Sequence, residues 1–211
     1  MSVLRIKICG ITRPRDARLA ERLGADMIGL IFAPKSPRRV TFSRASEIVR
    51  DLSPLLARVG VFVDEEPDRM IAAADRFGLD YIQLHGSESA VVIRTLQRRR
   101  LKVIKAFQMH KIGDDLPLRR SRADMVLLDN ISATQRGGTG QTFDWSLAPK
   151  KTIPNLVLSG GLTADNLSEG VKRFAPAMVD INSGVESSPG IKSPSKLKAL
   201  FERYRKIQDA S

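Results

Sequence analysis

Residues 3–32 read VLRIKICGITRPRDARLAERLGADMIGLIF, two apolar runs separated by a charged stretch. The two runs, 3–9 and 26–32, have the aliphatic composition of buried strands. The stretch between them begins with a proline start signal and ends at a glycine, which is typical of a helix. A strand, a helix and a second strand in this order indicate parallel pairing through a crossover.

The same unit recurs along the whole chain. Helix-like segments, such as TADNLSEGVKRF at 163–174, separate eight apolar runs at 3–9, 26–32, 58–63, 81–85, 102–107, 124–129, 155–160 and 178–182. Eight units in 211 residues are close to the shortest practical length for a closed α/β barrel. An open doubly wound sheet is the alternative, but the first run is followed by no GxGxxG. We therefore predict a single-domain (β/α)8 TIM barrel over residues 1–211.

The composition bounds the class of protein. The net charge is +12, and the densest basic patch, QRRRLK at 97–102, falls where a predicted helix ends, a place that favours cations. No aromatic side chains interleave that patch, so we expect a solvated surface that attracts anionic metabolites and no nucleic-acid partner. A single cysteine fits a reducing compartment, and no apolar run is long enough to span a membrane. We expect a cytoplasmic protein without a membrane partner.

Glycine-rich loops follow the last three predicted strands. In such barrels the chemistry gathers at the carboxyl ends of the strands, and the loops after strands seven and eight commonly bind phosphate. Glycine lets backbone N–H groups approach an anion closely, and Thr163 marks a helix start directed at the same place. Each glycine can also serve only a tight turn. We predict a phosphate-bearing substrate held by Gly138, Thr139, Gly140, Gly160, Gly161, Ser183 and Gly184.

Residue alternation gives the only cysteine an unusual position. Cys9 and Lys7 lie on one face of the first predicted strand, and the apolar Ile6 and Ile8 lie on the face that must meet the helices. Lys7 therefore points into the barrel, where a buried ammonium needs a partner. Asp180, on the eighth run beside the first, is the candidate. An adjacent ammonium favours the thiolate, so we expect Cys9 to act as a base or nucleophile near neutral pH.

Other polar residues stand at the predicted strand ends. Asp129 ends a buried run and suits a general acid, although the same carboxylate can instead cap its loop. Arg38, beside Arg39 in a proline-stiffened loop, can form a fork with a substrate carboxylate or remain a solvated cation. His85 can touch substrate or be structural. Because His85 and His110 have no ligand spacing, we predict no metal.

The motifs together resemble one family. KICGIT, GADMIGLIFAPKSPRRV, RVGVFVDEEP, IQLHG, VIKAF, LLDN…GGTGQTFDW, LVLSGGLTADN and DINSGVESSPGIK occur in order from residue 7 to 192, and this set resembles phosphoribosylanthranilate isomerase of tryptophan biosynthesis. The resemblance implies a cofactor-free Amadori rearrangement of a phosphoribosyl aminoaldose to an aminoketose. It implies that Cys9 removes the C2 proton, Asp129 protonates the ring oxygen, Arg38 binds the anthranilate carboxylate and the glycine loops hold phosphate.

Two departures and two alternatives accompany the resemblance. Ser193 stands where the family usually has an acidic residue, and Asn182 replaces a commoner serine near the expected phosphate site. The histidine-pathway barrel isomerase runs the same rearrangement, but it resembles a duplicated barrel with an aspartate in place of Cys9. A non-catalytic barrel that binds anions or RNA is the other alternative. The sequence leaves the oligomeric state open between monomer and homodimer.

Overall fold

The computed structural model describes residues 3–108, 121–129 and 153–210. In this part of the chain eight parallel strands close into a barrel in chain order, which confirms the predicted fold and excludes the open sheet. The strands are β1 (Arg5–Ile8), β2 (Met27–Ile31), β3 (Ala57–Phe62), β4 (Tyr81–Leu84), β5 (Lys102–Gln108), β6 (Met125–Asp129), β7 (Leu156–Ser159) and β8 (Met178–Ile181). Their ends differ from the predicted runs by at most two residues.

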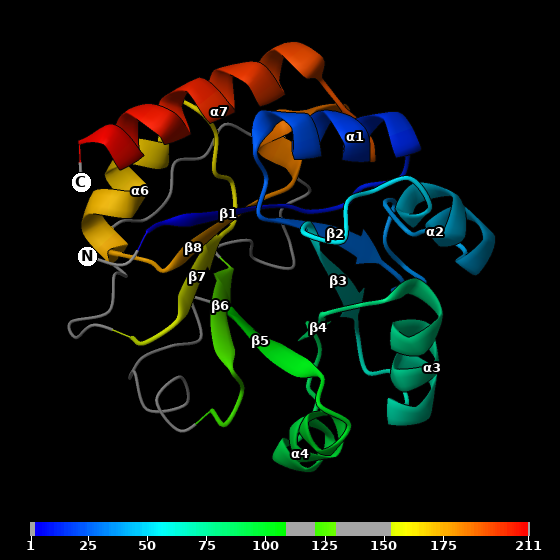
Figure 1. The fold of residues 1–211 in the computed structure, drawn as a ribbon. Coiled ribbons are helices and arrows are strands. Elements are labelled where there is room, and N and C mark those ends of the chain that lie inside the picture. Colours follow the sequence, from blue (N-terminus) through cyan, green and yellow to red (C-terminus); the bar gives the residue numbers. More distant parts are fainter. Residues whose placement is uncertain (1–2, 109–120, 130–152, 211) are drawn as a thin grey trace.

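Helices surround the barrel, with α7 lying beside α1 and α6 (Figure 1). The described helices are α1 (Pro14–Leu23), α2 (Phe42–Val49), α3 (Pro67–Phe77), α4 (Ala90–Arg98), α6 (Leu167–Phe174) and α7 (Pro194–Asp209). Local sequence explains their ends: the hydroxyls of Thr41, Ser89 and Ser193 accept backbone N–H groups at the starts of α2, α4 and α7. Ser193, one of the two departures from the resemblance, thus caps the start of α7. Within the described residues no helix is long and apolar enough to cross a membrane.

Two segments differ from the sequence-based prediction. The helix expected from Thr163 begins only at Leu167, because residues 163–166 form a turn in which the Thr163 hydroxyl accepts the N–H of Asp165. The predicted loop after β8 contains a 3₁₀ turn, η3 (Ser183–Val185), and a hairpin of β9 (Glu186–Ser188) and β10 (Ile191–Lys192). Strands this short carry almost no periodic signal, so their pairing was not visible in the sequence.

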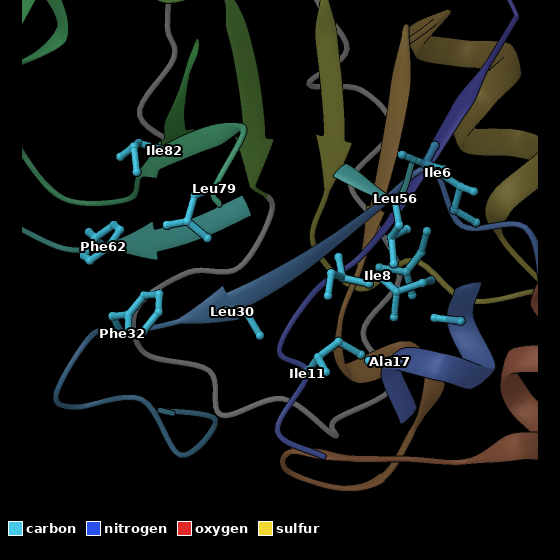
Figure 2. Packing of buried hydrophobic residues seen from close by; sticks show 14 of the residues in the cluster. Ile6, Ile8, Ile11, Ala17, Leu30, Phe32, Leu56, Phe62, Leu79 and Ile82 are labelled. Carbon is cyan, nitrogen blue, oxygen red and sulfur yellow. The ribbon is translucent and has the colours of Figure 1, made fainter. Parts of the chain in front are cut away.

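The strands bury a different set of side chains on each face. Ile6, Ile8 and Leu30 face outward into the main core between strands and helices (Figure 2). Inside the barrel, an apolar layer comprises Met27, Val59, Ile104, Ala106, Leu127, Val157 and Met178. Lys7 pairs in register with Asp180 on β8, and both side chains point inward above that layer. The face assigned to Lys7 and Cys9 from alternation is therefore confirmed.

Candidate active site

A cavity of about 230 Å³ opens among the carboxyl ends of the strands. It gathers the predicted site residues that the structure describes, namely Cys9, Arg38, His85, Asp129, Gly160, Gly161, Asp180, Ser183 and Gly184. Residues from the first, second, fourth, sixth, seventh and eighth βα units thus meet in one space. Gly138, Thr139 and Gly140 lie outside the described residues, as does His110.

The predicted partner of Lys7 is present. Lys7 Nζ lies 3.0 Å from Asp180 Oδ2, and both side chains are buried. Burial, the largest single influence, lowers the pKa of Lys7, but Asp180 and Cys9 together outweigh it, so the pKa lies above its usual value and the ammonium is kept. The other oxygen, Asp180 Oδ1, is buried at the cavity with no hydrogen-bond partner among the described residues. That oxygen can accept a hydrogen bond from a ligand.

Burial opposes the ionisation that the neighbouring ammonium favours at Cys9. Its side chain is 4% exposed, and burial, the largest influence, raises the pKa of the thiol above its usual value. The Lys7 ammonium lowers the pKa of Cys9 and so favours the thiolate, as predicted. Asp180, which pairs with the same ammonium, raises the pKa of Cys9. The Asp180 carboxylate thus offsets part of the effect of Lys7 on the Cys9 pKa. In this site burial therefore favours the thiol form of Cys9.

Replacing Lys7 by methionine is expected to slow alkylation of Cys9 and to shift its pH midpoint further upward. The variant loses the one contact of Cys9 that favours the thiolate most and leaves the Asp180 charge unpaired. Iodoacetamide modification measured against pH tests this. Lys105→Met is the matched control, because Lys105 is another buried lysine, paired with Glu88 at 2.8 Å. Lys105→Met is expected to leave the pH midpoint of Cys9 alkylation unchanged. If Lys7→Met also had the midpoint of the unchanged protein, Lys7 would not influence the ionisation of Cys9.

Glycines shape the walls around the thiol. A Cβ placed on Gly29 of β2 would lie 2.6 Å from Cys9 Sγ, so only glycine leaves room for that side chain in the barrel. Gly10, which follows Cys9, has φ +70°, a conformation that disfavours other residues. A Cβ there would overlap the side chains of Asn182 and Arg38. The chain can thus turn away directly after Cys9 while these side chains approach its backbone.

A chain of hydrogen bonds joins the Lys7 pair to Asp129. Lys7 Nζ donates to Gln83 Oε1 at 2.8 Å, and Gln83 Nε2 lies 3.0 Å from His85 Nδ1. His85 Nε2 lies 3.2 Å from Asp129 Oδ2. Sequence reasoning missed Gln83, although its place two residues before His85 puts both on one strand face. His85 contacts the candidate acid directly and also lines the cavity.

Arg38 reaches the cavity, whereas its neighbour Arg39 is exposed. The Arg38 guanidinium forms a fork on Glu186, with Nε 2.9 Å from Oε1 and Nη2 2.7 Å from Oε2. Glu186 is buried and also accepts a hydrogen bond from Lys192 Nζ, which in turn donates to Asn182. Burial raises the pKa of Glu186, but Arg38 and Lys192 outweigh it and hold the pKa below its usual value. The hairpin after β8 therefore fixes Arg38.

The ends of β7 and β8 bring backbone to the cavity. Gly160 and Gly161 follow β7 with φ of +92° and +70°. Ser183 and Gly184 stand in η3 after β8. A Cβ on Gly184 would overlap the carbonyl oxygen of Leu162, so the two loops pack in direct contact there. Such adjacent backbone segments suit an anion.

A small apolar wall completes the cavity. Cys9, Ile31, Ala33 and Val61 form one buried cluster, separate from the main core. All four side chains line the cavity, and they give it an apolar wall in addition to the polar side chains around Gln83. Sequence reasoning missed this wall because apolar residues near strand ends look like ordinary core. In the described part of the chain, no group of three or more His, Cys, Asp or Glu side chains is arranged to hold a metal ion.

Comparisons with known proteins agree on one family. The family model for N-(5'-phosphoribosyl)anthranilate (PRA) isomerase matches residues 6–203. The chain is 44% identical over 208 residues to the N-(5'-phosphoribosyl)anthranilate isomerase of Pseudomonas paraeruginosa, with 97% of each chain covered. The phosphoribosyl anthranilate isomerase structure from Thermotoga maritima is 37% identical, covers 96% of this chain and 99% of its own, and superimposes with a TM-score of 0.87. A phosphoribosyl anthranilate isomerase in complex with reduced 1-(o-carboxyphenylamino)-1-deoxyribulose 5-phosphate is 35% identical, with coverage of 96% and 99% and a TM-score of 0.81.

Proposed function

Since the chain belongs to the family of N-(5'-phosphoribosyl)anthranilate isomerases, enzymes of tryptophan biosynthesis, we propose that it isomerises N-(5-phosphoribosyl)anthranilate with Asp129 as general acid and Cys9 as general base. One observation carries the proposal. Cys9 at the end of β1 and Asp129 at the end of β6 line the same cavity, whose remaining walls carry glycine backbone, Arg38 and a small apolar cluster. An acid and a base that face one cavity from strands three positions apart in the barrel suit proton transfer at two atoms of one sugar.

In the first step Asp129 donates its proton to the ring oxygen of the ribose. The C1–O bond breaks, its electron pair stays on oxygen, and the nitrogen lone pair forms a C1=N bond that is positively charged. Asp129 becomes a carboxylate. His85 Nε2, 3.2 Å from Asp129 Oδ2, is placed to stabilise that new charge.

In the second step Cys9 loses its thiol proton to solvent in the cavity, and the resulting thiolate removes the proton from C2. The C–H electron pair forms the C1=C2 bond and neutralises the nitrogen. The resulting enol then gains a proton at C1 and loses its C2 hydroxyl proton, which gives the ketose. A thiol with a raised pKa is a strong base once ionised. The positive charge that the first step creates beside Cys9 favours the thiolate. Ring opening therefore comes first and promotes the ionisation of the base.

The substrate's functional groups match the walls of the cavity. The phosphate is placed at Gly160, Gly161, Ser183 and Gly184, where backbone N–H groups can surround it. The apolar cluster around Ile31 and Val61 accepts the aromatic ring. Arg38 binds the carboxylate of that ring, and the unpaired Asp180 Oδ1 accepts a hydrogen bond from a ribose hydroxyl. The site thus takes a small phosphoribosyl substrate, and the lone cysteine fits a cytoplasmic enzyme.

Replacing Arg38 by methionine is expected to raise KM by about 10- to 100-fold with a smaller change in kcat, because a charge-assisted hydrogen bond contributes about 1.5–3 kcal/mol to binding. The methionine keeps the aliphatic stem and removes the guanidinium. Arg39→Met is the matched control, since Arg39 is exposed. Steady-state kinetics of both variants test the assignment. An analogue without the carboxylate should bind both variants equally, and an unchanged KM in the Arg38 variant would exclude this role.

The activity itself is tested with freshly made phosphoribosylanthranilate in a spectroscopic assay. We expect conversion by the purified protein, abolished by denaturation. The aminoaldose substrate of the histidine pathway is run in parallel, and preferential turnover of that compound would reassign the enzyme. Conversion of neither compound, together with nucleic-acid binding at physiological salt, would favour the non-catalytic alternative.

A further inference from the structure

The hydrogen-bonding roles along the chain from Lys7 to Asp129 can be assigned from chemistry alone. Lysine can only donate, and the Lys7 ammonium is held by Asp180. The Gln83 atom 2.8 Å from Lys7 Nζ must therefore be the amide oxygen. This contact fixes which end of the amide is oxygen and which is nitrogen. The amide NH2 group consequently faces His85. Gln83 is 1% exposed, so water does not compete for either end.

The orientation of Gln83 determines the tautomer of His85. Gln83 Nε2, 3.0 Å from His85 Nδ1, can only donate, so Nδ1 must accept and carries no proton. The proton of the neutral imidazole is then on Nε2. Doubly protonated histidine would place two donors face to face at Nδ1. Gln83 therefore directs the single N–H of the neutral imidazole at Asp129 Oδ2, 3.2 Å away.

We propose that Gln83 is a positioning residue, which fixes the Nε2–H tautomer of His85 and through it orients and stabilises the Asp129 carboxyl during proton donation. The proposal rests on Asp129 being the acid of the proposed function. Asp129 Oδ2 lies 3.2 Å from His85 Nε2 and accepts its N–H. After transfer, the same N–H faces a full carboxylate and becomes a charge-assisted bond. This interaction strengthens as the reaction proceeds, so it acts on kcat.

The surroundings of His85 support a fixed geometry. Lys105 Nζ donates to the carbonyl oxygen of Gly86 at 2.6 Å and pairs with Glu88, and Glu88 also accepts the N–H of Gly86. The backbone directly after His85 is therefore anchored from β5 and from its own loop. The ring is held at Nδ1, at Nε2 and through the neighbouring backbone. Because the His85 ring is held in this way, a change at Gln83 alters the hydrogen bond that His85 makes with Asp129.

Gln83→Glu tests the proposal, because a carboxylate still accepts from Lys7 but must also accept from His85. We expect the proton to move onto Nδ1, seen by NMR of the enzyme with 15N-labelled imidazoles; the spectrum of His110→Asn identifies the His85 signals. We expect kcat to fall about 10- to 100-fold, as for other residues that orient a reacting group, with KM little changed. If this variant fails to fold, Gln83→Leu replaces it and is expected to show a mixture of both tautomers.

A double-variant cycle separates positioning from general damage. In a His85→Asn background the change Gln83→Glu is expected to cost little further in kcat, because the residue through which it acts is already gone. Protonated Nδ1 in the unchanged enzyme, an unaltered tautomer in Gln83→Glu, or fully additive losses would each overturn the proposal. An enzyme with the Nε2–H tautomer but no turnover of phosphoribosylanthranilate would instead contradict the proposed function, since the NMR measurement does not depend on activity.

Discussion

Cys9→Ser is expected to lose about 10²- to 10⁴-fold in kcat while the barrel stays folded, because this is the usual contribution of a general base. The serine hydroxyl is smaller than the thiol and fits the space that Gly29 leaves beside it. Its proton is far harder to remove, so the base needed at C2 is absent at neutral pH. Steady-state assays, with circular dichroism to confirm folding and calorimetry to confirm product binding, measure the effect.

The pH dependence of the unchanged enzyme adds a second test of Cys9. Because burial raises the pKa of the thiol, kcat/KM is expected to keep rising with pH through the neutral range, as more free enzyme carries the thiolate. Cys9→Ser should lose this rise together with its activity. Near-normal turnover in the serine variant would remove Cys9 from the mechanism. A flat profile in the unchanged enzyme would contradict the raised pKa while leaving Cys9 as a candidate.

The fold was predictable because the residue alternation within the strands and the order of strands and helices indicate the same barrel. Alternation within β1 placed Ile6 and Ile8 toward the helices and Lys7 inward, and the closure of eight strands put Lys7 beside Asp180. That pairing follows from strand order alone, since the first and last strands of a closed barrel are neighbours. The helix after β7 was placed too early because Thr163 caps a turn with the same hydrogen bond that starts a helix.

The site was less predictable where a pKa depends on several neighbouring charges, or where a side chain pairs with a residue far away in the sequence. The ammonium of Lys7 suggested an ionised Cys9, but the balance among burial, Lys7 and Asp180 is a property of packing in three dimensions. The partner of Arg38 is Glu186, 148 positions along the chain, in a hairpin too short to be recognised. Residue alternation within β4 would have found Gln83, since a polar residue on the face of His85 has to lie inside the barrel.

Asp129→Asn is expected to lower kcat by a similar factor, about 10²- to 10⁴-fold, with product binding largely kept. The amide has the size of the carboxyl, and its oxygen can still accept the N–H of His85, 3.2 Å away in the unchanged enzyme. What it lacks is a proton that it can give to the ring oxygen. Asp165→Asn is the matched control, because Asp165 is exposed in the turn after β7 and does not line the cavity.

The two variants also differ in the step at which they stop the reaction, and this distinguishes acid from base. Without an acid the ring stays closed, so Asp129→Asn should not exchange the C2 proton of the substrate with solvent. Adding a substrate analogue that is already ring-opened should restore proton removal in Asp129→Asn, because Cys9 is intact, and should not do so in Cys9→Ser. Equal failure of both variants on the opened analogue would mean that Asp129 also acts after ring opening, and equal success would mean that Cys9 is not the base.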